Sequence, residues 1–199
     1  MIIVDVETTG LDPKKHSIVS IGAIDFFNPE NQFYEECRIF DNAEITQEAL
    51  AINGFTEEQI KNPNKRPQRE VIKQFLIWIV KFNYRTIAGQ NPSFDRDFLK
   101  SAAERFKLYW PLHHRTVDLH SLCYANYLKR GLLPPIKEGM SNLSPSQIYI
   151  YVGLPEEKIP HNGLLGAKME AEAFSRLVYG KNLLQEFKQY EIPKYLNQN

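Results

Sequence analysis

Short apolar runs rich in β-branched residues dominate the first forty positions of the chain. Residues 2–6 (IIVDV), 17–27 (SIVSIGAIDFF) and 32–40 (QFYEECRIF) each have strand composition. The polar stretch 28–31 (NPEN) between the last two has the composition of a tight turn. These segments predict three strands joined by short connections, as in an antiparallel meander.

From residue 45 onward, apolar positions recur mostly at the spacing of helices, with two strand-like segments between them. Strands that alternate with helices after a meander predict one α/β domain, with a mixed sheet flanked by helices. We expect a capping pair at Thr56 and Gln59, a cap at Ser93, and loops over 62–67 and 130–142. The expected helices span 45–52, 56–62, 68–82, 93–106, 120–128, 144–153 and a long segment from Leu164; the expected strands are 84–90 and 115–119, the latter alternatively the start of the following helix.

Composition places the chain among ordinary globular proteins. It has 199 residues, 43% of them hydrophobic and 24% charged, which suits one domain with a sizeable core. The 24 basic and 24 acidic residues cancel. A neutral chain is not expected to coat nucleic acid indiscriminately, because such binding rests on the neutralisation of phosphates. A site that grips a few nucleotides stays compatible with this balance.

We expect neither a targeting segment nor a metal site built from cysteines. No apolar run approaches 18 residues, so we expect no membrane association, and the start MIIVDVE lacks the basic region of a signal peptide. Cys37 and Cys123 have no metal-like spacing, so they are interpreted as buried or idle thiols of a reducing compartment. The expected location is cytoplasmic.

Candidate chemistry begins in the first strand. Asp5 and Glu7 are separated by one residue and therefore point to the same face of a strand. Two carboxylates about 4 Å apart repel each other by about 4 kcal/mol at an effective dielectric constant of about 20. A divalent cation bound by oxygen ligands would compensate that repulsion. The alternative is a strand whose acids simply alternate toward solvent.

A second acid and a histidine extend this pattern. Asp95 falls one turn into a helix that follows a strand, where it can project toward the sheet. The alternative is an acid that only complements the helix dipole, which is our interpretation of Asp97. His161 directly precedes the last long helix, and its alternative is a structural or surface role. The other histidines form no convergent pattern: His16, His113, His114 and His120.

Three segments in this order resemble the DnaQ-like 3′–5′ exonucleases of the DEDDh type. They are VDVETTGL (4–11), NPSFDRDFL (91–99) and HNGLLGAKMEAEAF (161–174), and the similarity covers about residues 2–178. The resemblance implies a ribonuclease-H-like fold with a mixed five-stranded sheet. It also implies an exonuclease domain over 1–180, with 181–199 as a helical tail of the same domain.

The resemblance further implies two divalent cations, Mg²⁺ or Mn²⁺, at the scissile phosphate. Asp5 would bridge both ions, Glu7 would hold one, and Asp95 would support the other through water. His161 would be the general base. The implied substrates are single-stranded 3′ ends of DNA or RNA, shortened to nucleoside monophosphates, and the family allows a polymerase as partner. Residues expected to line the substrate site are Thr8, Thr9, Gly10, Leu11, Asn91 and Phe94.

The chain departs from the family at Gly166, where the resemblance implies a further metal-binding aspartate. We therefore expect an impaired metal site. Glu170 lies one turn later, about 6 Å further along the helix axis, and is interpreted as a surface acid; Glu172 falls on another face. Two alternatives remain: a non-catalytic module that binds nucleic-acid ends or a polymerase, and a small-molecule hydrolase that acts on dinucleotides.

Overall fold

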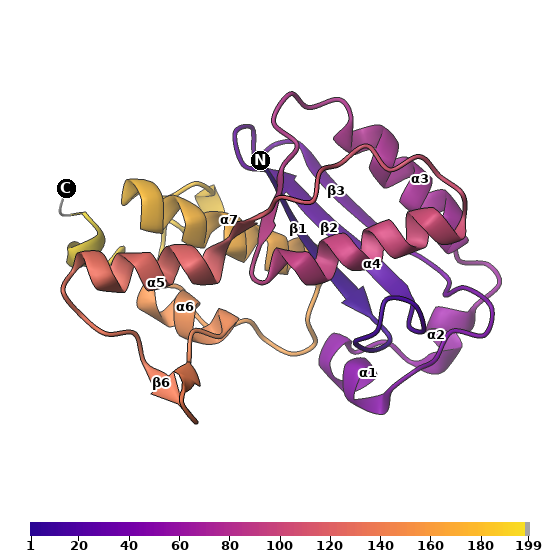
Figure 1. Ribbon diagram of the computed structural model, residues 1–199, viewed down its shortest axis with the longest axis horizontal. Coiled ribbons are helices and arrows are strands. Elements are labelled where there is room, and N and C mark those ends of the chain that lie inside the picture. The colour runs from indigo at the N-terminus through magenta and orange to yellow at the C-terminus, as the bar shows by residue number, and fades with distance from the viewer. Residues whose placement is uncertain (198–199) are drawn as a thin grey trace.

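A mixed five-stranded sheet forms the centre of the protein. The computed structural model describes residues 1–197 (Figure 1). The order of the strands is β3-β2-β1-β4-β5; β1 pairs antiparallel with β2 and parallel with β4. The other two pairs are antiparallel β2–β3 and parallel β4–β5. The strands span Ile2–Thr8 (β1), Ile18–Asp25 (β2), Gln32–Glu36 (β3), Ile87–Gly89 (β4) and Val117–Asp118 (β5).

Helices cover both faces of this sheet. Side chains of β1 alternate between the two layers: Ile2 and Val4 join the core under α3 and α4, whereas Ile3 joins the core under α7. Asp5 therefore belongs to the α7 side of β1. The helices span Gln47–Asn53 (α1), Glu57–Lys61 (α2), Gln68–Ile79 (α3), Pro92–Arg105 (α4), Leu119–Lys129 (α5), Pro145–Tyr151 (α6) and Gly163–Tyr179 (α7).

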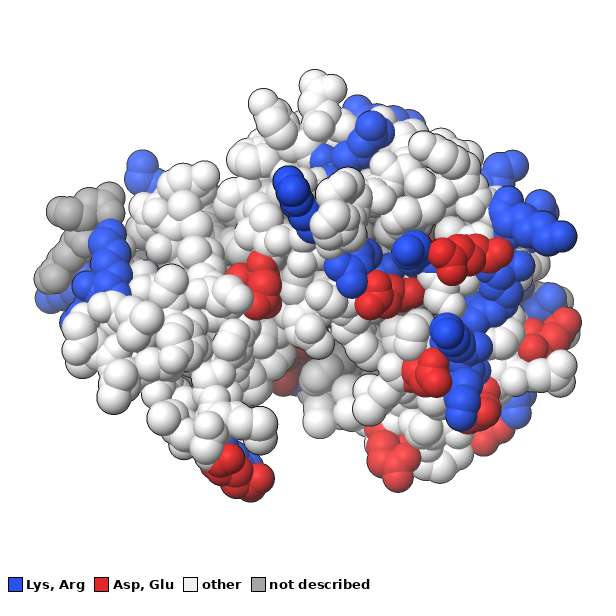
Figure 2. All heavy atoms as spheres, in the orientation of Figure 1, with Lys and Arg blue, Asp and Glu red and all other residues white. Residues whose placement is uncertain are grey.

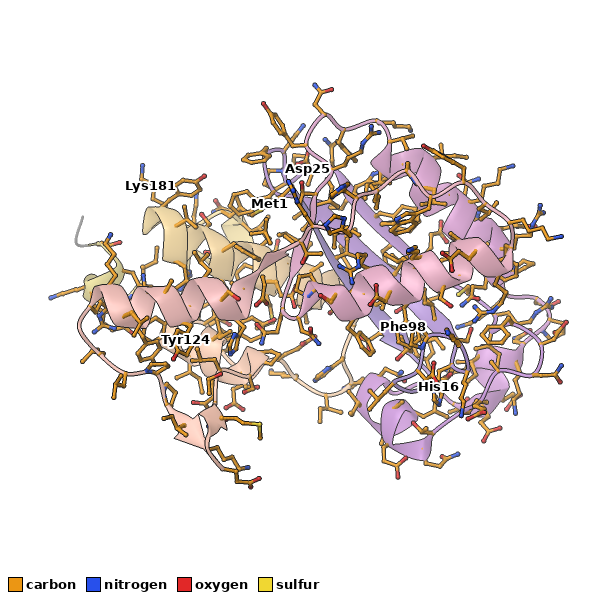
Figure 3. The ribbon with its side chains drawn as sticks, in the orientation of Figure 1. Met1, His16, Asp25, Phe98, Tyr124 and Lys181 are labelled. Atoms are coloured by element: carbon orange, nitrogen blue, oxygen red, sulfur yellow. The ribbon has the colours of Figure 1, made fainter. Side chains whose placement is uncertain are left out.

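Helix α4 is seated on the sheet by its apolar face. Figure 3 labels Phe98, which is 2% exposed and packs in the core between α4 and the strands. Ser101 at the middle of this helix donates from its hydroxyl to Pro13 O at 2.7 Å. These contacts hold α4 against the sheet and against the loop that follows β1.

The segment after α7 folds back onto the same core. It contains two short 3₁₀ helices, Gln185–Phe187 and Lys194–Leu196. The buried Arg176 of α7 donates to Phe187 O at 3.0 Å and is paired with Glu172 at 2.9 Å. The expected helical tail over 181–199 thus has two 3₁₀ turns within 181–197; its last two positions lie outside the described residues, and the division at residue 180 stays a prediction.

Several local expectations differ from the structure. Helix α4 begins at Pro92 with Asn91 as its N-cap, so the cap expected at Ser93 is wrong; proline is favoured in the first helical turn because it needs no backbone donor there. The expected loop over 130–142 contains a small hairpin, β6 (Ile136–Lys137) and β7 (Met140–Ser141). The segment 115–119 provides both a strand and the start of α5. Within residues 1–197, no helix has the length and apolarity needed to cross a membrane.

Candidate active site

The acids of the first two motifs meet where β1 approaches the start of α4. Asp95 is 5% exposed, and its Oδ1 accepts a hydrogen bond from Val6 N at 2.9 Å. That bond ties the second motif to the first across 89 residues of sequence. Glu7 is also buried, and Asp5 is partly buried. The prediction that Asp95 projects from its helix toward the sheet is confirmed.

One pocket, here called the acid pocket, collects most of the expected chemical groups. It brings together Asp5 and Asp95 with His161 from the segment before α7. It also contains two acids that were not expected there, Glu157 and Glu170. The residues lining the acid pocket are Asp5, Val6, Gln90, Asn91, Phe94, Asp95, Pro145, Ser146, Tyr149, Glu157, His161 and Glu170.

Burial close to other carboxylates raises the pKa values of these carboxyl groups. Burial, followed by repulsion from Glu170 and Glu7, raises the pKa of Asp5 well above its usual value. Burial raises the pKa of Glu7 to about 7. The pKa of Asp95 rises to about 7 for the same reason, although the hydrogen bond from Val6 N opposes the shift. The site therefore carries a charge conflict that protons or cations would relieve.

This conflict predicts how the stability of the metal-free protein depends on pH. Because the folded-state pKa of Glu7 and of Asp95 is raised, the folded protein binds more protons than the unfolded chain. The resulting stability is fully present below about pH 4 and is lost as pH rises through about 7. Melting temperature in a chelating buffer should fall by several degrees from pH 5.5 to 8. A melting temperature that rises over this window would contradict the prediction.

Glu170 is buried rather than on the helix surface, which corrects the expectation. It is 6% exposed. Its Oε2 is buried without a hydrogen-bond partner. Burial raises its pKa well above the usual range, followed by repulsion from Asp95. The physical reason is that α7 is enclosed by the sheet on one side and by α5 and α6 on the other, so little of this helix faces solvent.

His161 occupies the position expected for it. Its side chain is 35% exposed and lines the acid pocket. Its backbone N donates to Ile52 O at 3.0 Å, which anchors the segment before α7 to the end of α1. The following residue, Asn162, caps α7 by accepting from Leu164 N and Leu165 N, both at 3.1 Å. The histidine thus stands beside the carboxylates with one side open to solvent.

Gly166 faces Asp5 from the first turns of α7. A Cβ atom at this position would overlap Oδ2 of Asp5 and would lie 3.6 Å from Oε1 of Glu157. Residue 166 thus faces the acid of the first motif. Sequence reasoning missed Glu157, which lies in the charged segment between α6 and α7 and there has the composition of a solvated loop.

A second pocket, here called the apolar pocket, adjoins the acids. Phe94 and Val6 line both pockets, so the two adjoin at these residues. Leu11 is 81% exposed at its edge. The residues lining the apolar pocket are Val6, Glu7, Thr8, Gly10, Leu11, Thr46, Glu48, Ala49, Ile52, Asn53 and Phe94.

Thr9 differs from the other expected substrate residues. It is fully buried, donates to Glu44 O at 2.6 Å and accepts from Ser17 N at 2.9 Å. His16, labelled in Figure 3, packs against Gly10, and its Nδ1 accepts from Asp12 N at 3.0 Å. Both side chains hold the loop after β1 in shape, and Thr9 lies outside the two pockets.

The donor set fits hard divalent cations. Carboxylate oxygens are the preferred ligands of Mg²⁺ and Mn²⁺, and Oε1 of Glu157 and Oε2 of Glu170 are buried oxygens without partners. Buried polar groups ordinarily have partners, so these two require an explanation. Across residues 1–197, no three acidic, histidine or cysteine side chains are already arranged as ligands of one ion. Binding would therefore require the carboxylates to reorient.

Comparison with known families decides the class of protein. The family model described as Exonuclease (RNase_T) matches residues 2–174, which include all three motifs. The chain belongs to this exonuclease family. The five-stranded sheet and its flanking helices are the ribonuclease-H-like fold that the resemblance implied.

Individual relatives agree with this assignment. The chain is 28% identical over 178 residues to the 3′-5′ DNA exonuclease Cap18 of Escherichia coli, covering 87% of this chain and 88% of that protein. It is 34% identical over 101 residues to the PolC-type DNA polymerase III of Thermotoga petrophila, covering 50% of this chain and 7% of the polymerase. The nuclease domain of 3′hExo, a DEDDh family member solved with rAMP, superposes with a TM-score of 0.67 at 17% identity, covering 96% and 94% of the chains.

Proposed function

We propose that this exonuclease removes nucleoside monophosphates from the 3′ ends of single-stranded nucleic acid by hydrolysis assisted by two divalent cations. The observation that carries the proposal is the acid pocket, where buried carboxyl groups with raised pKa values stand beside a partly exposed histidine. Such a cluster in a cleft is typical of a catalytic site. The activity printed in the name of Cap18 supports the same reaction class.

Each protein group has a defined task in this proposal. Asp5, Glu7 and Asp95 would hold the cations, and when bound the cations would neutralise charge on the scissile phosphate and on the oxygens that attack and leave. His161 would accept the proton of the attacking water, as an imidazole near neutral pH can. Phe94 lies between the two pockets and would pack against the terminal nucleotide, whose base would reach Leu11.

We propose that the protein recognises its substrate mainly at the end of the strand. On the face shown in Figure 2, basic and acidic side chains are interspersed over the half that contains the sheet. With a net charge of zero, the chain would gain little from general neutralisation of phosphates. We expect binding energy to come from the end of the strand in the two pockets, including Thr8, Gly10 and Asn91, and to depend only weakly on salt.

Because residue 166 is glycine, the site has one carboxylate fewer than the family pattern would supply. We propose that the metal site is weaker than one with an acid at this position, with an activity set by the remaining acids.

The similarity to a PolC-type polymerase makes a polymerase a candidate partner of this chain. Two free, buried cysteines, Cys37 and Cys123, fit a reducing compartment, so we propose a cytoplasmic location.

Divalent cations should stabilise the folded protein. Anything that binds only the folded state raises its stability by mass action, by about 2.7 kcal/mol at a hundredfold excess over Kd. In a chain of this size, that corresponds to a rise in melting temperature of several degrees. Thermal unfolding with millimolar Mn²⁺ against a chelator should show this rise. An unchanged melting curve would contradict metal binding.

A ladder assay distinguishes the proposed function from its alternatives. Oligonucleotides of DNA and RNA labelled at the 5′ end should shorten one residue at a time with Mn²⁺, and a blocked 3′ end should prevent this. Binding without shortening would favour the non-catalytic module. Cleavage of dinucleotides with long strands left intact would favour the small-molecule hydrolase.

A further inference from the structure

Position 166 of α7 carries no carboxylate, but a carboxylate from the segment between α6 and α7 lies next to it. Gly166 of α7 faces Asp5, and the side chain of Glu157 approaches the same place from the segment between α6 and α7. We propose that Glu157 supplies the metal ligand that position 166 cannot. The inference rests on the proposed function, because it assigns a further residue to the same cation site.

The position of Oε1 of Glu157 is the first argument. It lies 3.6 Å from the point where a Cβ of residue 166 would stand, and that point overlaps Oδ2 of Asp5. The two carboxylates therefore both lie beside the space that a side chain at position 166 would enter. An aspartate at 166 would extend its carboxylate from this point. Glu157 places carboxylate oxygens in the same region from a different segment of the chain.

The burial of Glu157 is the second argument. Its side chain is only 9% exposed, although it belongs to an irregular, charged segment. Oε1 is buried and has no hydrogen-bond partner. A carboxylate oxygen is costly to bury unpaired, and a cation would offset that cost. A cation in the acid pocket, which Glu157 lines, would therefore account for the unpaired oxygen.

The other oxygen of Glu157 faces the expected general base. Oε2 lies 3.9 Å from Nδ1 of His161, four residues further along the same irregular segment. The backbone N of His161 donates to Ile52 O at 3.0 Å, which fixes the histidine beside this carboxylate. Glu157 thus has one oxygen near Asp5 and the other near His161. That placement couples the cation site to the base.

Glu170 is the competing candidate, and its surroundings place it elsewhere. Its unpaired Oε2 lies 2.8 Å from the position of a Cβ on Gly89. It therefore reaches toward the end of β4. Glu170 is the charge that most raises the pKa of Asp5, but the atoms nearest a Cβ at position 166 belong to Asp5 and Glu157. Glu157 is the acid beside Gly166.

Mn²⁺ affinity measured by calorimetry tests the assignment without depending on turnover. Glu157→Gln should weaken binding about tenfold or more, since outer groups of metal sites alone account for factors of about 10–100. The matched control is Glu156→Gln, which changes the exposed neighbouring acid and should bind as the unmodified chain does. Unchanged affinity in Glu157→Gln, or loss confined to Glu170→Gln, would overturn the proposal.

A transplanted ligand provides the second test. Gly166→Asp should restore Mn²⁺ affinity in the Glu157→Gln background, with Asp5 rotating away from the added side chain. In the unmodified background the same substitution should raise Mn²⁺ affinity by a smaller factor, because Glu157 already supplies a carboxylate there. A double variant that melts cooperatively but still binds weakly would overturn the replacement of one acid by the other.

The outcomes separate this inference from the proposed function. If the unmodified chain binds Mn²⁺ and Asp5→Asn abolishes binding while Glu157→Gln does not, only the inference fails. If neither the unmodified chain nor any variant binds Mn²⁺, the cation-assisted function itself fails.

Discussion

Replacing Asp5 with asparagine is expected to lower the rate of 3′-end cleavage by more than about a hundredfold, a factor that even outer groups of metal sites can reach. Asp5 lines the acid pocket, and the other acids there, together with the neighbouring Glu7, contribute to its raised pKa: Glu170, Glu7, Asp95 and Glu157. Without its charge, the cations would lose the ligand that the site is built around.

The same substitution should stabilise the protein when no metal is present. An amide has nearly the shape of the carboxyl group but carries no charge to bury, and it ends the repulsion with Glu170 and Glu7. Loss of activity together with a higher melting temperature in a chelator would be the signature of a functional charge conflict. Lower stability and lower activity together would instead indicate a damaged fold.

Asp97→Asn is the matched control for this experiment. Asp97 is a carboxylate of α4, but it is exposed and paired with Arg96 at 2.8 Å. Its removal should leave cleavage and Mn²⁺ binding unchanged. Equal losses in both variants would show that negative charge near α4, rather than the acid pocket, supports the activity.

Replacing His161 with glutamine is expected to reduce the cleavage rate by about 10²–10⁴, the range contributed by a positioned general base. Mn²⁺ affinity should change little, because the carboxylates remain. The side chain of His161 is partly exposed, so the fold should tolerate the change. Initial rates and Mn²⁺ titrations on the same preparation would separate loss of the base from loss of the ions.

His120→Gln is a suitable comparison. His120 bonds through Nε2 to Ser141 Oγ at 2.6 Å and lies outside both pockets. Its replacement should leave the cleavage rate within about twofold, as is common for surface changes away from a site. A His161→Gln variant as active as this control would return His161 to a structural role.

The sequence predicted those parts of the site that lie on regular elements. Asp5 is placed by the two-residue period of β1, and Asp95 by the first turn of α4. The short strand β4 was overestimated at 84–90, because local composition does not show where pairing with a neighbouring strand ends. Element types were easier to predict than their boundaries.

The two additional acids could not be predicted in the same way. Glu170 had a signal, since it shares the helix face of Gly166, but its burial depends on how α5 and α6 enclose α7. Glu157 had none, because the path of its segment is fixed by contacts with distant residues such as Ile52. Tertiary packing determined both positions.

The most direct measurement of the central claim is the fate of solvent oxygen during cleavage. With Mn²⁺ in oxygen-18-labelled water, attack on the terminal phosphodiester should break the bond to the 3′ oxygen of the preceding nucleotide. Mass spectrometry should then find one labelled oxygen in the phosphate of a released nucleoside 5′-monophosphate, and an unlabelled strand one residue shorter. Internal fragments, label on the remaining strand, or no released nucleotide would contradict the assignment as a 3′–5′ exonuclease.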